Sequence, residues 1–460
     1  MSAHEPSELI YGLEDKPAPL PAFLTALQHV MASLVGIITP PLIVSSALGL
    51  DAYLPWLISM SLMVSGAGTF LQARRPFGIG AGMICLQGTS FAFLGVILAA
   101  GFTVKSRGGG PEQIMAMIFG LTLIAAFIPV VVSRFLGQLR RVITPLVSGT
   151  VLCLIGISLI KVSITDWGGG HGAKDFGAPG NLLLGLLTLM TIVLFSRAGN
   201  RWLRLGAVIL GIAFGCLLAA LSGKLHWQPF THSWVALPQP LRFGFDFDYT
   251  LFLPFALISL ICILEAVGDL TANCLLSRRP IEGDEYVGRL RGGILADGAS
   301  CVLAALFSAL PSTTFAQNNG VIQMTGVASR RVGLWIGALL ALLGLFPIFG
   351  AAIQQIPAPV LGGATLVMFG SVLAAGIRIM TQSPLTRRDM LIIAVSFGIG
   401  LGVEAEPAFL SQLPPVFKNL FGSAVASGGI TAMLLNLLLP GEGSERPSVQ
   451  AAAAKNRAPR

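Results

Sequence analysis

The chain has 460 residues, of which 54% are hydrophobic and only 11% are charged, against about 25% charged residues in ordinary soluble domains. Its mean hydropathy is +0.80, and apolar runs of about 20 residues, the length of a membrane-spanning helix, recur along it. This composition excludes a soluble globular enzyme, a disordered chain and a secreted disulfide scaffold. It predicts an all-α polytopic membrane protein.

The net charge of +8 does not point to nucleic acid. The basic residues come as pairs and triplets between apolar runs, where they act as topology signals for membrane insertion. All six cysteines lie in or at the ends of apolar stretches without the spacing of metal ligands, so we expect buried free thiols and no metal site. The N-terminal residues are acidic and lack an apolar run, so no cleavable signal peptide is expected.

We expect fourteen membrane spans, which leave enough chain for the connecting loops. In chain order they are 22–48, 54–73, 79–100, 113–133, 142–160, 181–196, 205–222, 250–275, 294–310, 312–328, 333–352, 359–377, 389–403 and 419–439. The tenth, 312–328, is the exception among them, because it contains no apolar run of helix length.

The distribution of basic residues decides whether this tenth segment crosses the bilayer. With fourteen spans and both termini in the cytoplasm, the cytoplasmic loops hold 17 basic residues and the outer loops hold 7. If 312–328 did not cross, five of the 17 would move outside and one outer lysine would move inside, which gives 13 against 11. Cytoplasmic loops are enriched in Lys and Arg, so the segment is expected to cross.

A polar segment at membrane depth is tolerated only inside protein or against a cavity. Pro311 and Gly320 interrupt the tenth segment, and residues 312–315 favour an extended chain. We therefore predict a short strand that leads into a half-helix. Broken spans of this kind form the binding sites of many transporters.

Two short motifs recur seven spans apart. Residues 89–92 (Thr-Ser-Phe-Ala) in the third span match residues 313–316 (Thr-Thr-Phe-Ala) in the tenth. Since seven is odd, the second half is inverted relative to the first, and the sequence predicts two inverted seven-span repeats. A proline and two glycines of the fifth span recur independently with the same spacing in the twelfth: Pro145, Gly149 and Gly156 match Pro359, Gly363 and Gly370.

Only three acidic side chains are expected well inside spans: Glu265, Asp269 and Asp297. A charge at the bilayer centre costs about 2.5–3.5 kcal/mol, so each needs a partner or a cavity. Glu265 and Asp269 lie one turn apart on one helix face, where two carboxylates repel each other, and at least one is expected to carry a proton. A proton-coupled step requires such a group. The alternative is a structural pair that is hydrogen-bonded to neighbouring backbone.

Three amides, Gln317, Asn318 and Asn319, lie where the broken span is expected to cross the midplane. An amide offers a donor and an acceptor together, which suits the edge of a planar lactam, and a facing carboxylate accepts N–H bonds from the ring. The alternative for Asn318 and Asn319 is capping of a helix start. Phe91 and Phe315, which the repeat relates, suit contact with a flat ring, and core packing suits them equally well.

His29 lies beside Gln28 in the first span, where a structural role competes with one in proton transfer. The other histidines are scattered in loops and the tail. The chain has no GxSxG or HExxH motif, so an enzyme is not expected. Residues 441–460 are basic and rich in alanine, which predicts a disordered C-terminal tail.

Residues 317–330 (QNNGVIQMTGVASR) resemble the signature of the nucleobase-ascorbate transporter family, and the sequence around them is most similar to its bacterial xanthine permeases. Residues 28–29 (QH), 264–269 (LEAVGD) and 295–298 (LADG) resemble other motifs of that family. The resemblance covers nearly the whole chain, from residue 9 to residue 440.

This resemblance implies proton-coupled purine uptake by an elevator-like motion, in a homodimer in the bacterial inner membrane with both termini in the cytoplasm. It implies short antiparallel strands in spans 3 and 10, and no cofactor besides the proton. The partners it implies are a purine nucleobase, protons and the lipid bilayer, without nucleic acid. The implied parts are a cytoplasmic tail (1–20), a core domain (21–136 and 248–353, spans 1–4 and 8–11), a gate domain (137–247 and 354–440, spans 5–7 and 12–14) and the tail 441–460.

The resemblance also assigns roles to single residues. Glu265 resembles the carboxylate that hydrogen-bonds the purine, and Gln317 resembles the amide that faces the ring. Asn318 resembles the neighbour that tunes affinity and specificity, and Phe91 resembles a ring-stacking position. The positions that resemble carboxylates needed for transport, or a histidine that supports the geometry of the site, are Asp269, Asp297 and His29.

Ser90 departs from the pattern of narrowly selective relatives. Bacterial xanthine permeases of narrow range carry Asn at this position, whereas fungal relatives that accept uric acid with xanthine carry Ser. The shorter serine leaves room near Glu265. The chain is therefore expected to accept xanthine, with uric acid or guanine as further substrates.

Other readings stay open. One is a symporter of uracil, another nucleobase or ascorbate within the same family. Another is an anion exchanger of the sulfate-carrier type, which shares this architecture, although a carboxylate such as Glu265 in the pocket repels anions. The last, from a different class, is an intramembrane enzyme or receptor that uses the same acidic groups.

Overall fold

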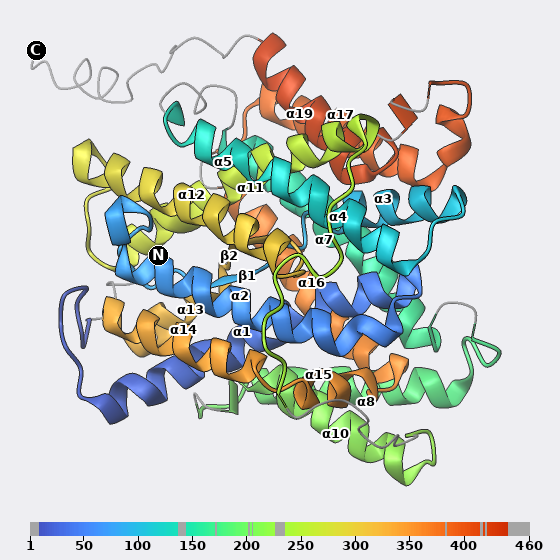
Figure 1. The fold of residues 1–460 in the computed structure, drawn as a ribbon, viewed down its shortest axis with the longest axis horizontal. Helices are drawn as coiled ribbons and strands as arrows, with labels where there is room; N and C mark the ends of the chain where they lie inside the picture. The colour runs from blue at the N-terminus through green and yellow to red at the C-terminus, as the bar shows by residue number, and fades with distance from the viewer. Residues whose placement is uncertain are drawn as a thin grey trace, which may run out of the picture.

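The structure is a computed structural model that describes residues 9–136, 144–170, 173–200, 203–204, 206–225, 235–381, 384–414, 417–418 and 421–439. It is a bundle of helices, most of which run from one side of the view in Figure 1 to the other. The C-terminal residues 441–460, expected to be disordered, lie outside the described residues.

The first half of the chain contains ten helices and one strand among its described residues. In order they are α1 (Pro19–Leu48), η1 (Asp51–Tyr53), α2 (Leu54–Arg74), η2 (Pro76–Gly78), β1 (Gln87–Thr89), α3 (Leu94–Ser106), α4 (Pro111–Ala125), α5 (Phe127–Val132), α7 (Pro145–Gly168), α8 (Pro179–Ser196) and α10 (Ala207–Leu221).

The second half repeats this plan. Its described elements are α11 (Tyr249–Leu276), α12 (Gly283–Leu306), β2 (Ser312–Thr314), α13 (Gln317–Thr325), α14 (Arg330–Gly344), α15 (Ile348–Gln354), α16 (Ala358–Met380), α17 (Arg387–Ala405), η3 (Pro407–Leu410) and α19 (Ala424–Leu438).

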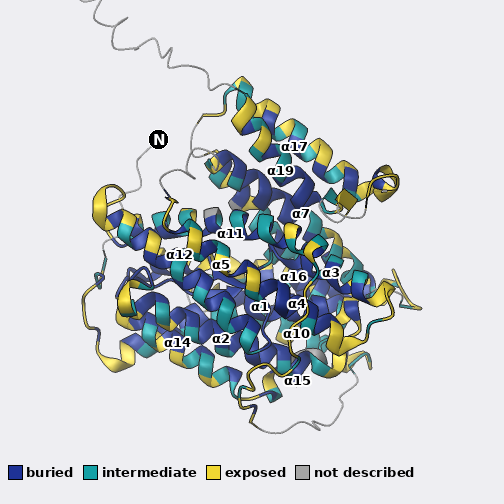
Figure 2. Ribbon diagram, turned by 45° about the horizontal axis from the view of Figure 1, so that its top comes forward, coloured by how far each residue is buried: buried dark blue, intermediate teal, exposed yellow. Residues whose placement is uncertain are grey.

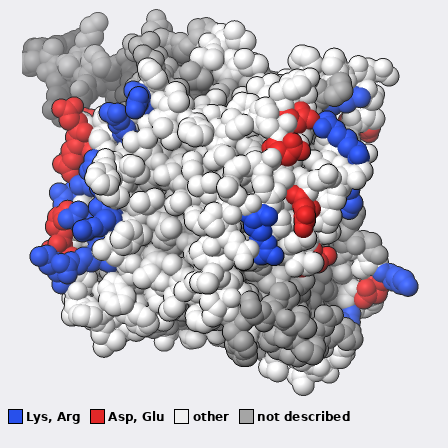
Figure 3. Space-filling model, in the orientation of Figure 1, with Lys and Arg blue, Asp and Glu red and all other residues white. Residues whose placement is uncertain are grey.

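Most of the expected spans overlap one of these helices, and 79–100 and 312–328 each overlap a strand and the helix that follows it. The expected spans 113–133 and 333–352 each overlap two successive helices, α4 with α5 and α14 with α15. By length and composition, seven helical segments in the described chain are long and apolar enough to cross a membrane, and α3, α10 and α19 are shorter apolar helices. On the face shown in Figure 3, charged side chains gather at the left edge and on the right-hand part, with an uncharged band between them. The all-α membrane fold predicted from the sequence is confirmed.

The helices pack in two groups. In one group, α2 packs against α14, α1 and α12, and α11 packs against α12 and α4. In the other, α7 packs against α16 and α19, and α17 packs against α19. Figure 2 shows α17 and α19 at one end of the molecule, apart from α2 and α14. The division into a core and a gate domain, with its residue boundaries, stays a prediction.

Of the glycines in the second sequence motif, the two on α7 explain its tight contact with α16. A Cβ atom at Gly149 would lie 2.7 Å from the carbonyl oxygen of Gly376, and one at Gly156 would lie 2.7 Å from the backbone nitrogen of Leu373. Any larger residue at either glycine would push the two backbones apart.

The tenth span is broken as predicted, into β2 and the half-helix α13, and the third span is broken in the same way by β1. The two strands pair antiparallel. The register is Gln87 with Thr314, Gly88 with Thr313, and Thr89 with Ser312.

The N-terminal segment 9–15 is bound to the chain that follows α13. The Ala328 backbone N–H donates to the Tyr11 carbonyl at 2.9 Å, and the Ser329 hydroxyl donates to the Asp15 carbonyl at 2.6 Å. Tyr11 also forms a parallel bridge with Val327. These residues therefore hold the far end of the half-helix to the beginning of the chain.

Candidate substrate and proton site

Glu265, on α11, faces a cavity between the two groups of helices. No hydrogen bond or ion pair involves its carboxylate among the described residues, and the side chain is only partly buried. The carboxylate is therefore free to bind a ligand in the cavity. The cavity is lined by Ser148, Val151, Leu152 and Ile155 of α7, Ile261 and Glu265 of α11, and Ile379 of α16.

Gln317 is the first residue of α13, and its side chain is exposed without a hydrogen-bond partner in the described chain. The start of α13 is held against α11, because the Asn319 amide donates to the Asp269 carbonyl oxygen at 3.2 Å. Asp269 lies one helical turn from Glu265. Glu265 lies on α11 and Gln317 lies on α13, and the bond between Asn319 and Asp269 holds these two helices together.

Asn318 is buried and faces away from open space. Its amide donates to the Ile84 carbonyl at 2.5 Å, and the Asn273 amide donates to the same oxygen at 2.6 Å. The chain before β1 is buried and not helical, so its carbonyl groups need such donors. Neither Asn318 nor Asn319 caps α13, which has no side-chain cap at its N-terminus. A direct role for Asn318 in substrate binding stays a prediction.

His29 is fully buried in α1 and interacts with Asn318. Both ring nitrogens lack a hydrogen-bond partner of good geometry, and so does the Asn318 side-chain oxygen. The Asp269 Oδ2 atom is buried without a partner as well. Buried polar groups are rarely left unpaired, so ordered water is expected between these side chains. The structural hydrogen-bonded pair considered for Glu265 and Asp269 is absent among the described side chains.

The two phenylalanines that the repeat relates lie in different surroundings. Phe91 forms an edge-to-face contact with Phe369 of α16, with ring centroids 5.4 Å apart and an interplanar angle of 82°. Phe315 is buried and packs against Gly36 and Gly88. Phe91 thus lies at the contact between the two helix groups, whereas Phe315 lies inside one of them. Contact of either ring with a substrate stays a prediction.

Asp297 is held by two amides that the sequence did not identify. The Nε2 atoms of Gln87 and Gln72 donate to its Oδ1 atom at 2.6 and 3.1 Å. Gln87 also accepts from the Ser312 hydroxyl at 3.3 Å, which ties the carboxylate to both strands. These glutamines lie in the second and third spans, and their polar character within apolar runs is the signal that could have found them.

The packing of Phe315 against β1 gives a first testable prediction. A Cβ atom at Gly88 would lie 2.4 Å from Cζ of the Phe315 ring, so Gly88→Ala forces the ring and the strand apart. Overpacking of a core costs about 1–3 kcal/mol. We expect a lower thermal midpoint in detergent micelles, measured by size-exclusion chromatography after heating.

The matched control is Gly398→Ala on α17, where an added Cβ meets nothing within 4 Å. Ala is the better helix former, so this variant is expected to melt at or above the midpoint of the unchanged chain. Equal midpoints for Gly88→Ala and the unchanged chain would contradict the packing described here.

The comparisons with known proteins agree on a class. Residues 21–409 match the Permease family. The chain is 45% identical over 443 residues to xanthine permease XanP of Escherichia coli strain K12, covering 95% of this chain and 96% of the relative. It is 44% identical to XanQ of the same strain, with 95% of each covered. It is 33% identical to the uric acid-xanthine permease of Emericella nidulans, covering 95% of this chain and 84% of the relative.

Solved structures with a similar fold are more distant in sequence. The transmembrane domain of the cyanobacterial bicarbonate transporter BicA matches with a TM-score of 0.55 and 15% identity, over 93% of this chain and 99% of that one. SLC26A9 matches with a TM-score of 0.58 and 13% identity, over 90% of this chain and 65% of that one. At this identity the likeness concerns the fold alone.

Proposed function

Since the chain belongs to the nucleobase-ascorbate transporter family, we propose that it takes up purine nucleobases, xanthine foremost, together with protons. It is a multi-pass membrane transporter and not an enzyme. The observation that carries the proposal is the pair Glu265 and Gln317, two side chains without a hydrogen-bond partner in the described part of the chain. They lie on elements held together by the bond between Asn319 and Asp269.

The chemistry of this pair fits a purine with carbonyl groups. A carboxylate accepts hydrogen bonds from ring N–H groups, and charge-assisted bonds of this kind are about twice as strong as neutral ones. The Gln317 amide donates to a ring carbonyl oxygen and accepts from a neighbouring N–H. The substrate named for the relatives at 44–45% identity supports xanthine over uracil or ascorbate.

Proton coupling is supported by the surroundings of the three acidic side chains. Among the described residues, no ion pair involves Glu265, Asp269 or Asp297. A carboxylate inside a membrane span without a neighbouring cation has a high free energy in its charged form, and binding a proton removes that charge. A proton on one of these groups would then accompany each substrate molecule.

An elevator-like motion is supported by the division of the site. Glu265 and Gln317 belong to the helix group with α2 and α14, whereas α7 and α16 of the other group line the facing wall of the cavity. A substrate held by the first group would move with it along the second. We propose further that the chain works as a homodimer in the bacterial inner membrane with both termini in the cytoplasm, as the family resemblance implies.

The second candidate is an anion exchanger, which the fold shared with the murine anion transporter Slc26a9 favours. The free Glu265 carboxylate opposes it, because a negative group at the cavity repels an anionic substrate.

Uptake of labelled xanthine into bacteria that lack their own purine permeases tests the proposal. We expect uptake that a protonophore abolishes and that unlabelled uric acid and guanine reduce. Hypoxanthine and uracil serve as further competitors, and sulfate tests the anion exchanger. If the protein is present in the membrane and xanthine does not enter, the xanthine assignment is wrong. Uptake that the protonophore leaves unchanged would disprove proton coupling.

The range of substrates gives the second prediction. Ser90 is buried, and its hydroxyl lies 3.6 Å from the sulfur of Cys262, which is one helical turn from Glu265 on α11. Ser90→Asn adds bulk at this position, so we expect xanthine uptake to persist while competition by uric acid and guanine weakens roughly tenfold. Inhibition constants against labelled xanthine measure the effect. The control Ser371→Asn lies on the exposed side of α16 and should leave them unchanged. Unchanged inhibition by all purines in Ser90→Asn would count against this role of Ser90.

A further inference from the structure

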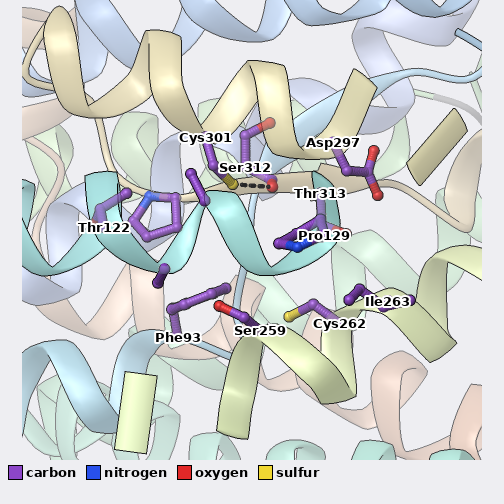
Figure 4. Close-up of a pocket in the computed structure, with 13 residues that line it drawn as sticks. Phe93, Thr122, Pro129, Ser259, Cys262, Ile263, Asp297, Cys301, Ser312 and Thr313 are labelled. Carbon is purple, nitrogen blue, oxygen red and sulfur yellow. Dashed lines mark hydrogen bonds between the residues drawn. The ribbon is translucent and has the colours of Figure 1, made fainter. Parts of the chain in front are cut away.

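A second cavity lies against a different face of α11 from the one that carries Glu265. Ser259, Cys262 and Ile263 line it, whereas Ile261 and Glu265 face the other cavity. At 3.6 residues per turn, Ser259 and Ile263 point well away from Ile261 and Glu265, whereas Cys262 lies between the two faces, one turn from Glu265. Figure 4 shows the cavity with Asp297 at one end of the lining and with Phe93, Ser259 and Thr122 at the other. Ala125, Pro129, Cys301 and Thr313 line it as well.

This cavity has a buried polar group without a partner among the described residues. The Thr313 hydroxyl lines it, is buried, and has no hydrogen-bond partner in the described chain. Pro129 has no N–H group, so the Ala125 carbonyl lacks its usual partner four residues along the helix. α4 ends at Ala125, and α5 begins at Phe127. Unsatisfied polar groups that line a cavity are typical binding places for ordered water.

Asp297 presents one oxygen atom that remains available. Its Oδ1 atom already accepts from Gln72 and Gln87. Gln72 cannot turn its amide around, because its own oxygen accepts the Ala81 backbone N–H at 3.0 Å. No hydrogen bond to Oδ2 is present among the described residues, and Oδ2 is not among the fully buried atoms without a partner. Since Asp297 lines the cavity, Oδ2 is the oxygen that a proton can reach.

Building on the proposed proton-coupled transport, we propose that this cavity holds water and carries the proton to and from Asp297 Oδ2, along a path separate from the substrate cavity at Glu265. In the loading step, a hydronium ion in the cavity transfers its proton to Oδ2. An O–H bond forms on the carboxyl group as one breaks in the hydronium ion, and a neutral water molecule remains. The side chains that interact electrostatically with Asp297 are Glu265 and Asp269 of α11, and the thiols of Cys85, Cys262 and Cys301.

If the substrate and the proton use separate cavities, a change at the water cavity should affect net uptake but not the exchange of xanthine. Exchange of labelled for unlabelled xanthine needs the substrate cavity only, whereas net uptake driven by a pH gradient also needs proton transfer. Ala125→Leu places three extra carbon atoms at the wall of the water cavity, away from Glu265. In proteoliposomes with a pH dye inside, we expect exchange at the rate of the unchanged chain. Net uptake and the accompanying proton movement should fall by at least about tenfold.

A native thiol provides a second test. Cys262 and Cys301 both line the cavity, but Cys262 also contacts Ser90 on the substrate side, so the test uses Cys262→Ser and leaves Cys301 as the target. Methyl methanethiosulfonate reacts with a thiolate to form a disulfide that carries a methylthio group, and methanesulfinate leaves. We expect this reagent to reduce net uptake of Cys262→Ser but not its exchange. A variant with Cys262→Ser and Cys301→Ser should be insensitive to it, which excludes an effect through the other cysteines.

The outcomes separate the possibilities. Net uptake that is unchanged in Ala125→Leu overturns the proposed path. If Ala125→Leu loses both modes, the thiol experiment decides, and equal loss of exchange and net uptake after modification also overturns the path. If the unchanged chain moves xanthine without protons, the proposed function itself fails, and this result is distinguishable because it needs no variant.

Discussion

Glu265→Gln is expected to abolish concentrative xanthine uptake. The carboxylate faces the cavity without a partner among the described residues, so we expect a ring N–H of the substrate to donate to it. Gln is nearly isosteric but neutral, and loss of one charge-assisted bond costs about 2 kcal/mol, or about thirtyfold in affinity. The variant also cannot take up a proton at this position. Binding measured by calorimetry and uptake of labelled xanthine check the two effects.

Glu406→Gln is the matched control, since the same chemical change is made at an exposed side chain after α17. It should bind and transport as the unchanged chain does. Glu265→Asp keeps the charge but withdraws it by one methylene group, and we expect it to retain part of the uptake. Full transport by Glu265→Gln would remove Glu265 from both proposed roles.

Asp297→Asn is expected to fold and to lose proton-driven uptake. The Asn side-chain oxygen can still accept from Gln72 and Gln87, while its amide group replaces the oxygen that a proton can reach. Exchange of xanthine should continue, because the substrate cavity is intact. Asp297→Ala instead leaves two buried amides without an acceptor, at about 1–3 kcal/mol each, so we expect much less folded protein. Proteoliposome transport and thermal midpoints in detergent distinguish the two variants.

Asp284→Asn serves as the control on the same helix, where the side chain is exposed in the first turn of α12. It should leave both transport modes and the thermal midpoint nearly unchanged. If Asp297→Asn retained net uptake with its accompanying protons, the proton would have to bind elsewhere.

The broken tenth span was predictable because two independent sequence signals agreed on it. The polar composition of 312–328 argued against an ordinary helix, and the placement of basic residues required the chain to cross there. The repeated Thr-x-Phe-Ala motif then pointed to a partner in the third span, and β1 and β2 pair at that position. Local composition and charge were sufficient here, because both signals are contained in the segment itself and in the loops beside it.

The amides that hold Asp297 were not predictable in the same way. Gln87 and Asp297 are 210 positions apart, and no periodicity relates them. Sequence pattern also does not determine which side of a half-helix faces substrate. Gln317 and Asn318 are neighbours with similar chemistry, yet Gln317 is exposed and Asn318 is bonded to Ile84. Such contacts follow from the tertiary arrangement of the two repeats.

The segment 9–15 has a consequence for the order in which the protein assembles. The bond between Ser329 and Asp15 spans 314 positions. Asp15 is synthesised early, so this bond cannot form until Ser329 has been synthesised much later. β1 also enters the membrane long before β2, and its strand hydrogen bonds remain unmade until the second half arrives. Closing such long loops is slow compared with forming single helices. The half-finished chain therefore holds buried polar backbone that only the second half can satisfy, and the two repeats complete folding together.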